Sequence, residues 1–246
     1  MISVCMSTYN GEKYLKRQMD TILEQLEQDD ELVISDDSSD DGTLKIIKSY
    51  SDKRIRLFEN NHFKSPVFNL ELALKQAKGD SVFLADQDDV WLPGRVQKVK
   101  ERLQDNDLVV CNAFIVDQNE KVIHESYFSW KGSGPGFWEN LKKNSFLGCS
   151  MAFNRKILNA VLPFPGKVIM HDIWIGLVAE SIGKVFFLDE KLILYRRHAD
   201  NVTAAIHRDD AHLSDFSTAF KLWYRLALLI QVVWRYLKVR SKKAKG

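Results

Sequence analysis

Three polar segments of the chain each follow a short run of apolar residues. They are Ser7-Thr8-Tyr9-Asn10 after residues 2–6, Asp36-Asp37-Ser38-Ser39-Asp40 after residues 31–35, and Asp86-Gln87-Asp88-Asp89 after residues 82–85. In an open sheet of parallel strands, ligands bind beyond the carboxyl ends of the strands. Polar and acidic clusters at three strand ends therefore predict one shared pocket.

The acidic residues of this pocket indicate a divalent cation. Carboxylates repel a pyrophosphate group unless a cation lies between them, and Mg²⁺ and Mn²⁺ bind carboxylate oxygens together with substrate phosphates. Asp86 and Asp88 are two residues apart, so in an extended segment both side chains point toward the same ligand. Acidic turns that only cap helices are common. The apolar strand before Asp86 and the nearby Asp36-Asp37 nevertheless favour a Mn²⁺ or Mg²⁺ site that neutralises charge on a leaving group.

Short β-forming runs alternate with longer helical patterns, which predicts βαβ units on a largely parallel sheet. The predicted strands are residues 2–6, 31–35, 55–58, 81–85, 108–116, 147–153, 185–188 and 192–195. The predicted helices are residues 14–26, 43–50, 67–77, 94–103 and 171–182. Three glycines and a proline in residues 132–136 make residues 126–136 a candidate mobile loop that folds over a substrate.

Length and composition fit one catalytic domain, residues 1–215, followed by a C-terminal extension, residues 216–246. The chain has 246 residues, of which 45% are hydrophobic, enough to bury one large core. Cys5, Cys111 and Cys149 lie singly among apolar neighbours, which predicts reduced core thiols and neither a disulfide nor a zinc site. Since no basic leader precedes the first strand, we expect a cytoplasmic protein.

The C-terminal extension differs from the rest of the chain, because all eight charged side chains after Asp215 are basic. A helical pattern puts Leu222, Leu226, Leu229, Ile230, Val233 and Leu237 on one face and Lys221, Arg225, Arg235, Lys238 and Lys242 on the other. The longest uncharged run, residues 226–234, is far shorter than the roughly 20 residues needed to cross a bilayer. The pattern predicts an amphipathic helix on the inner face of the cell membrane, or one that completes the domain or forms a dimer. Its apolar bulk favours a lipid surface over nucleic acid as the partner.

Five motifs of the chain resemble those of the family 2 glycosyltransferases. They are Ser3-Val4-Cys5-Met6-Ser7-Thr8-Tyr9-Asn10-Gly11, Ile34-Ser35-Asp36-Asp37-Ser38-Ser39-Asp40-Asp41, Ala77-Lys78-Gly79-Asp80, Ala85-Asp86-Gln87-Asp88-Asp89-Val90-Trp91 and His171-Asp172. The resemblance covers residues 1–205, with the motifs in matching order. It implies the GT-A fold, a Rossmann-like α/β architecture with a mostly parallel central sheet, and inversion at the anomeric carbon of the sugar.

The resemblance also implies a role for each residue of the pocket. The implied contacts to the nucleotide sugar are Ser7, Tyr9 and Asp37 at the pyrimidine base, Asp86 at the ribose and Arg196 at the phosphates. The implied metal ligands are Asp88, its neighbour Asp89, and His198.

An inverting displacement needs a general base that takes the proton of the acceptor hydroxyl, and the resemblance puts this base at Asp172. Position 171 carries a histidine where the family commonly has glutamate, so no role is assigned to His171. Trp174 is the candidate for stacking on the acceptor sugar, since an aromatic face packs well against the apolar face of a sugar ring.

The acidic motif and the His171-Asp172-x-Trp174 sequence look most like those of rhamnosyltransferases within this family. We therefore expect transfer of L-rhamnose from dTDP-rhamnose to a lipid-linked saccharide, in the synthesis of a surface polysaccharide such as O-antigen or capsule. The alternative donor is a UDP-hexose carrying galactose, glucose or N-acetylglucosamine, since no residue identified above reads the sugar hydroxyls.

Three other classes of protein fit the residues less well. A nicotinamide or flavin oxidoreductase needs Gly-x-Gly-x-x-Gly after the first strand, where this chain has Ser7-Thr8-Tyr9-Asn10-Gly11. A nucleotidyltransferase needs a basic, glycine-rich loop at the same place. A sugar-nucleotide-binding subunit without turnover would not require both Asp88 and the candidate base Asp172.

Overall fold

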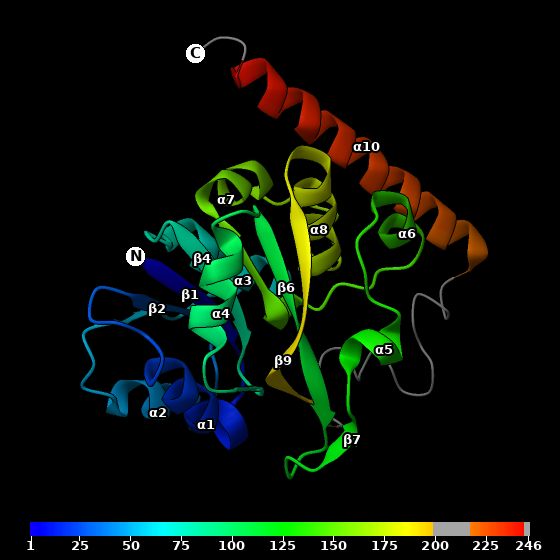
Figure 1. Ribbon diagram of the computed structural model, residues 1–246. Coiled ribbons are helices and arrows are strands. Elements are labelled where there is room, and N and C mark those ends of the chain that lie inside the picture. The colour runs from blue at the N-terminus through cyan, green and yellow to red at the C-terminus, as the bar shows by residue number, and fades with distance from the viewer. Residues whose placement is uncertain (199–216, 244–246) are drawn as a thin grey trace.

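The computed structural model describes residues 1–198 and 217–243. The strands are β1 (Ile2–Thr8), β2 (Glu31–Asp36), β3 (Ile55–Phe58), β4 (Ser81–Asp86), β5 (Val90–Trp91), β6 (Leu108–Val116), β7 (Val122–His124), β8 (Met151–Asn154) and β9 (Val185–Arg196). They form one mixed sheet in the order β3-β2-β1-β4-β8-β6-β9-β5, with β7 paired to β6 (Figure 1).

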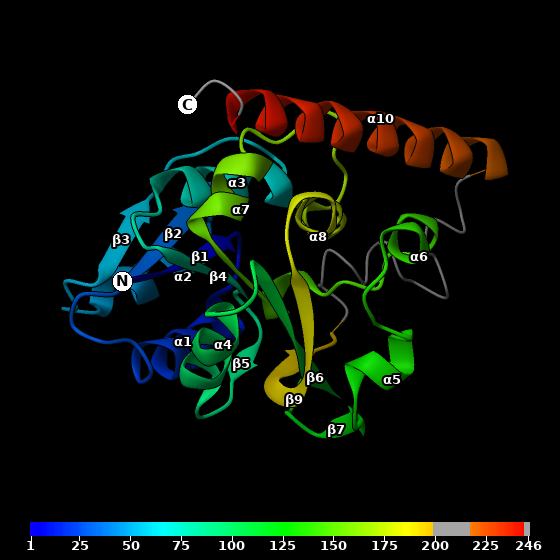
Figure 2. The same ribbon diagram turned by 45° about the horizontal axis from the view of Figure 1, so that its top comes forward.

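Helices cover both faces of the sheet (Figure 2). One face carries α1 (Glu12–Leu23), α2 (Thr43–Ser49) and α4 (Arg95–Leu103). The other carries α3 (Pro66–Gln76), α7 (Arg155–Val161) and α8 (His171–Ile182), and α10 (Thr218–Lys243) lies across its outer side. The short helices α5 (Tyr127–Lys131) and α6 (Phe137–Lys142) follow β7 in the chain.

Strand β1 is central to the fold and explains why the polar segments meet. Its side chains alternate between the two cores, with Val4 and Met6 toward α1 and Cys5 toward α3. Both of its neighbours, β2 and β4, run parallel to it, and Ser7 lies in register with Ser35 on one side and Asp86 on the other. The expected α/β fold with a mostly parallel sheet is confirmed, and the carboxyl ends of β1, β2 and β4 share one edge.

The second half of the sheet differs from the sequence prediction. Residues 185–188 and 192–195 belong to one continuous strand, β9, which runs parallel to β6. The β6–β9 register shifts beside Asn112, whose side-chain amide donates to Asp189 Oδ1 at 2.6 Å. The Asn112–Asp189 pair lies where the sequence predicts a gap between two strands, and β9 continues through this position.

Two further segments are also more structured than expected. The segment 126–136 contains α5, because Ser126 accepts a hydrogen bond from the Ser129 N–H as an N-cap and Gly132 (φ 73°) ends the helix in the left-handed region. The predicted strand at 147–153 starts as a 3₁₀ turn, η1 (Gly148–Ser150), before β8. The remaining unpredicted elements are α6, α7, β5 and β7, which have at most seven residues each.

Helix α10 docks on the domain through a face that carries a buried cation. Tyr224, Leu228 and Val232 join the core beneath α8. Arg235 continues this face, and its guanidinium donates to the backbone oxygens of Ala160 (2.8 Å), Leu162 (2.6 Å) and Pro163 (2.6 Å). The helical pattern predicts Arg235 on the polar face of this helix, and at Arg235 that face is turned toward the domain, where the guanidinium satisfies carbonyls at the end of α7.

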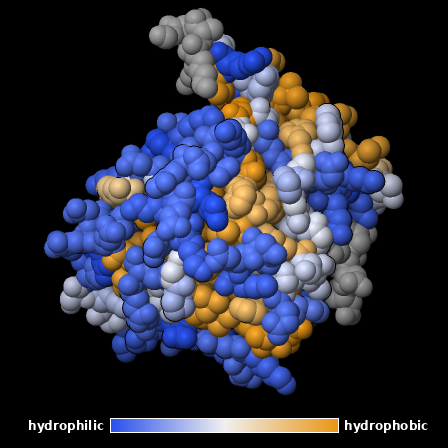
Figure 3. Space-filling view, viewed as in Figure 1, coloured by the Kyte–Doolittle hydropathy of each residue, from blue (hydrophilic) through white to orange (hydrophobic). Residues whose placement is uncertain are grey.

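The predicted apolar face of α10 points outward. Leu222, Leu226, Ile230, Val233 and Leu237 are all exposed, and hydrophobic surface is visible along the helix (Figure 3). Among the described residues, no helix has the length and apolar character required to cross a membrane.

Arg235→Ala is expected to destabilise the protein, because three carbonyls at the end of α7 lose the charged donor that the buried Arg235 supplies. A loss of about 3 kcal/mol corresponds to a thermal midpoint lowered by roughly 6–12 °C. The exposed Arg240→Ala on the same helix is the matched control, with little change expected. Equal midpoints of the two variants in a thermal unfolding experiment would contradict the docking role of Arg235.

Candidate active site

The acidic loop at the end of β4 forms a cluster of potential metal ligands. Carboxylate oxygens of Asp86 and Asp89 and the sulfur of Cys149 lie within 4.8 Å of one another. Asp89 is almost fully buried, and its Oδ1 accepts a hydrogen bond from the Arg196 N–H at 3.0 Å. Its Oδ2 is buried with no hydrogen-bond partner in the described part of the chain. Such an oxygen is suited to a ligand absent from the protein itself.

Burial and neighbouring carboxylates shift the pKa values of this cluster upward. Burial, with the charges of Asp88 and Asp172 adding to it and the Arg95 guanidinium opposing it, raises the pKa of Asp86 to about 7. Burial likewise raises the pKa of Asp89 well above its usual range, with Asp88 and Asp86 contributing. Hard carboxylate oxygens at this spacing suit Mg²⁺ or Mn²⁺, so these side chains fit the cation expected from the sequence.

The pairing of β5 with β9 brings the rest of the acidic loop to the end of β9. Val90 lies in antiparallel register with Leu194, so the residues just before Val90 face the residues just after Leu194. His198 Nε2 accordingly lies 2.9 Å from Asp88 Oδ2. Asp88 and His198, two of the three metal ligands that the family resemblance implies, lie 110 positions apart in the chain and are neighbours in the structure.

Arg196 supports the acidic loop from within the protein. Its side chain is almost fully buried, and its Nε donates to the Asp88 carbonyl at 2.7 Å. Its Nη1 donates to the Gln118 carbonyl at 3.0 Å, and its Nη2 pairs with Glu120 Oε1 at 3.1 Å. The structure therefore does not place this guanidinium at the phosphates as predicted, because these partners hold it against the loop backbone.

The residues predicted to hold the pyrimidine base line the neighbouring part of the same edge. Ser7 lies next to Asp86 in the sheet register, and the Tyr9 side chain is exposed. Asp37 follows β2, and its Oδ1 accepts a hydrogen bond from the Phe63 N–H at 2.6 Å. The sheet thus brings Ser7, Tyr9 and Asp37 to the edge that carries the acidic loop.

Gln87 connects the acidic loop to the segment after β1 by hydrogen bonds, a role that the sequence did not indicate. Its Oε1 accepts from the Tyr9 N–H at 3.0 Å, and its Nε2 donates to the Tyr9 carbonyl at 2.9 Å. From the helix side, Gln18 is fully buried and donates to the Asp86 carbonyl at 2.8 Å. The sequence signal that could have found Gln18 is its helical spacing from the apolar residues Leu15 and Ile22, because an amide on such a face needs a hydrogen-bond partner.

Arg95 is a further positioning residue that the sequence analysis missed. It is fully buried, its guanidinium carbon lies 3.9 Å from the Trp91 ring centre, and its Nη2 donates to the Cys149 carbonyl at 2.6 Å. Burial lowers the pKa of Arg95, and the nearby acids Asp89 and Asp86 oppose that shift. A cation beneath the carboxylates lets this much negative charge be buried in one loop.

Asp172, the candidate general base, begins α8. It is largely buried, and its Oδ2 accepts a hydrogen bond from Asn144 Nδ2 at 3.0 Å. Its charge raises the pKa of Asp86, so the two carboxylates lie close enough to interact.

Next to Asp172, His171 Nε2 is buried without a partner among the described residues, and a Cβ at Gly148 would approach this nitrogen to 2.3 Å. Only glycine fits opposite His171, which keeps the start of α8 in place.

Trp174 does not face the site. Its side chain is fully buried, and its indole N–H donates to the Val161 carbonyl at 3.0 Å. The predicted acceptor contact of Trp174 is therefore wrong, because the side chain two positions after Asp172 on α8 points into the core. Trp130 on α5 is instead 42% exposed, with Arg197 at 5.4 Å and Lys131 at 5.8 Å from its ring centre.

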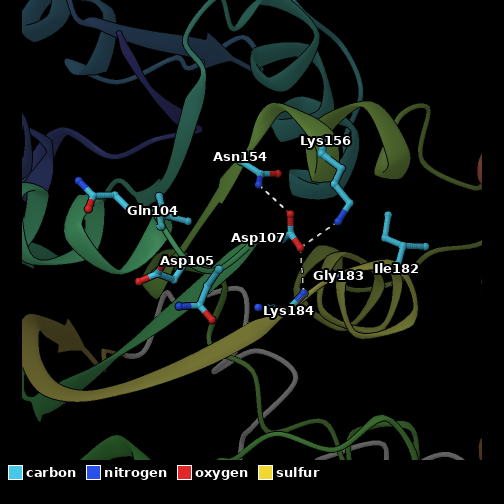
Figure 4. Close-up of a pocket in the computed structure, with 10 residues that line it drawn as sticks. Gln104, Asp105, Asp107, Asn154, Lys156, Ile182, Gly183 and Lys184 are labelled. Carbon is cyan, nitrogen blue, oxygen red and sulfur yellow. Dashed lines mark hydrogen bonds and ion pairs between the residues drawn. The ribbon is translucent and has the colours of Figure 1, made fainter. Parts of the chain in front are cut away.

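A separate hollow of about 400 Å³ lies at the opposite end of the sheet, beside the start of β6 (Figure 4). Its central carboxylate, Asp107, accepts hydrogen bonds from Asn154 Nδ2 (2.8 Å), Lys156 Nζ (2.9 Å) and the Lys184 N–H (2.9 Å). Because these polar groups bind one another, we interpret the hydrogen bonds of Asp107 as a structural cross-link between β6, β8 and the end of α8.

Comparison with known proteins identifies the family. A family model described as Glycosyl transferase family 2 matches residues 3–162. The chain is 32% identical over 219 residues to an uncharacterized glycosyltransferase of Nostoc sp., covering 81% of this chain and 66% of that one. It is 26% identical over 239 residues to the dTDP-rhamnosyl transferase RfbG of Shigella flexneri, covering 89% and 81% of the two chains.

Another relative is the UDP-Glc:alpha-D-GlcNAc-diphosphoundecaprenol beta-1,3-glucosyltransferase WfgD of Escherichia coli, 25% identical over 184 residues, with 74% of this chain and 71% of that one covered. Among solved structures, S. aureus TarS 1-349 in complex with UDP-GlcNAc matches with a TM-score of 0.65 at 19% identity, over 80% of this chain and 58% of that one. This likeness supports the GT-A fold. The chain spans less than two thirds of the Nostoc relative and of the TarS chain. Since the family model covers more than half of the residues, including the acidic loop, the chain belongs to glycosyl transferase family 2.

Proposed function

We propose that this chain is an inverting, metal-dependent glycosyltransferase that moves a sugar from a nucleotide diphosphate to a lipid-linked saccharide. The observation that carries the proposal is the buried cluster of Asp86, Asp89 and Cys149, with Asp88 and His198 paired beside it. It stands at the edge that the predicted nucleotide-binding residues share. Asp172 lies within electrostatic reach on the acceptor side.

In the proposed site, Asp88, Asp89 and His198 hold the cation, and Asp86 lies between them and the ribose. Bound there, Mg²⁺ or Mn²⁺ supplies Lewis-acid stabilisation of charge on the departing diphosphate. Arg196 and Gln87 hold the loop backbone, so the ligands keep their positions while the leaving group departs.

Asp172 acts on the acceptor. Its carboxylate takes the proton of the attacking hydroxyl as the new bond from that oxygen to the anomeric carbon forms and the bond from that carbon to the phosphate oxygen breaks. The nucleoside diphosphate leaves from the opposite face, so the anomeric configuration inverts. Asn144 donates to Asp172 Oδ2 and keeps the carboxylate oriented toward the acceptor.

For the donor we propose dTDP-rhamnose first, because the dTDP-rhamnosyl transferase aligns with 89% of the chain. The glucosyltransferase that uses UDP-Glc supports UDP-glucose as the second candidate. The name of that relative also supports a diphosphoprenol-linked saccharide as the acceptor, and hence a place in surface polysaccharide synthesis.

We further propose that the exposed face of α10 rests on the membrane that holds this acceptor. The face carries Trp234 with Lys238 Nζ 4.8 Å from its ring centre, an amphipathic pair suited to a lipid interface. The described part of α10 carries no acidic residue, so anionic headgroups would meet only cations.

A donor panel tests the enzyme class. With Mn²⁺ or Mg²⁺ present, we expect binding and slow hydrolysis of dTDP-rhamnose or UDP-glucose but not of GDP-mannose, as measured by calorimetry and nucleotide release. A chelator should abolish turnover. If no nucleotide sugar binds, or if the chelator changes nothing, the proposed function is wrong.

Two variants separate the roles of the carboxylates. Asp172→Asn should lower turnover about 10²- to 10⁴-fold with donor affinity nearly unchanged, because only proton removal is lost. Asp88→Ala should lower both donor affinity and turnover, because it removes a metal ligand. Asp105→Asn, exposed at the far end of the sheet, is the control. Equal loss of donor affinity in Asp172→Asn and Asp88→Ala would refute this division.

Membrane association is best tested by surface substitution. Deleting α10 would expose the core around Tyr224, Leu228 and Val232, so a truncated chain gives no clean answer. In flotation with phosphatidylglycerol vesicles, the double variant Ile230→Gln/Trp234→Gln should reduce the partition coefficient about tenfold or more. Ile123→Gln, an exposed apolar site on β7, is the control. Unchanged flotation of the double variant would exclude α10 as the membrane contact.

A further inference from the structure

Helices α6 and α10 enclose an apolar groove of about 290 Å³. Its lining consists of Trp138, Leu141 and Lys142 from α6 and Leu222, Arg225, Leu226 and Leu229 from α10. Trp138 (65%), Leu222 (68%) and Leu226 (56%) are each more than half exposed. Large apolar side chains that flank an open groove in this way mark a binding surface for an apolar group.

The groove has a fixed wall, because polar contacts anchor α6 to the domain. The Gly136 N–H donates to Glu180 Oε1 at 2.8 Å, and Asn140 Nδ2 donates to the Gly134 and Gly136 carbonyls at 2.9 and 3.0 Å. Gly136 has a φ of 136°, which only glycine adopts readily. Trp138 is therefore exposed on a helix whose position is fixed by these hydrogen bonds.

The charges of the groove select the kind of ligand. Its two charged residues, Lys142 and Arg225, are both cations. An apolar chain that ends in phosphate matches this combination, whereas an uncharged lipid or an acid-free peptide would leave the cations without a partner.

The groove also lies close to the candidate base. Lys142 ends α6 and is two residues from Asn144, whose amide donates to Asp172 Oδ2. Two residues of chain span at most about 7 Å. Burial lowers the pKa of Lys131, the charge of Asp172 opposes this shift, and the charges of Lys143 and Arg197 add to it, so Lys131 lies within electrostatic reach of all three groups.

We propose that the α6–α10 groove binds the first isoprenoid units of a prenyl-diphosphate-linked saccharide, with Lys142 and Arg225 against its diphosphate and its sugar directed toward Asp172. This inference rests on the proposed function for the identity of the acceptor. It adds a site that recognises the lipid itself, distinct from the membrane contact of the outer face of α10.

Two substitutions on one helix test the groove. Leu226 lines it, whereas Ile230, one turn further on and 59% exposed, does not. Calorimetric titration of the full chain with farnesyl diphosphate, below its micellar concentration, should show binding that Leu226→Gln weakens about tenfold. Ile230→Gln should change the dissociation constant less than twofold. Binding of inorganic pyrophosphate should be insensitive to both substitutions but weakened by Arg225→Gln.

Several results would overturn the proposal. Absence of farnesyl diphosphate binding, or equal weakening by Leu226→Gln and Ile230→Gln, would mean that the groove does not recognise the chain. Dissociation of a dimer by Leu226→Gln in sedimentation would make a second copy of the protein the occupant. Because this titration needs no donor, its outcome is independent of the donor panel. If the chain binds nucleotide sugars but not farnesyl diphosphate, the proposed transferase function stands and the proposed lipid site in the groove is wrong.

Discussion

The structure depends on holding several carboxylates together at one edge of a parallel sheet. A buried anion without a partner is costly, yet Asp86 and Asp89 both lie in one loop with raised pKa values. The protein compensates from two sides, with the Arg95 charge beneath the loop and the Arg196 N–H on Asp89. The pKa values remain raised in spite of these partners, chiefly because both carboxyl groups are buried and because neighbouring carboxylates add to the shift. A divalent cation, as proposed above, would favour the ionised form of these carboxyl groups.

The same requirement explains why the end of β9 is a structural part of the site. The carboxylates of this loop repel one another, so the loop keeps its conformation only if other contacts hold its backbone. The short β5–β9 pairing and the Arg196 contact to the Asp88 carbonyl fix it, and they bring His198 to Asp88 in the same step. Arg196 therefore stabilises the arrangement of the acidic loop, and the contacts that the structure describes direct its guanidinium to backbone carbonyls and to Glu120.

The sequence predicts the positions of the site residues better than the directions of their side chains. Strand ends follow from alternation and turn chemistry, so the predicted meeting of the segments around Ser7, Asp37 and Asp86 follows from the parallel sheet. Whether Trp174 points toward Asp172 or into the core depends on how α8 packs, which no local pattern encodes. Arg235 presents the same problem, because its carbonyl partners lie more than 70 positions away in the chain.

The orientation of α10 reverses the usual rule for a helix on a globular domain. Normally the most apolar face packs inward and the charges face water, but here a cation is buried and Leu226, Ile230 and Trp234 are exposed. Three carbonyls at the end of α7, those of Ala160, Leu162 and Pro163, account for the buried cation. On the other side of the helix, Leu226, Ile230 and Trp234 are exposed in the part of the chain that the structure describes, which leaves this face open to an apolar partner such as the membrane proposed above.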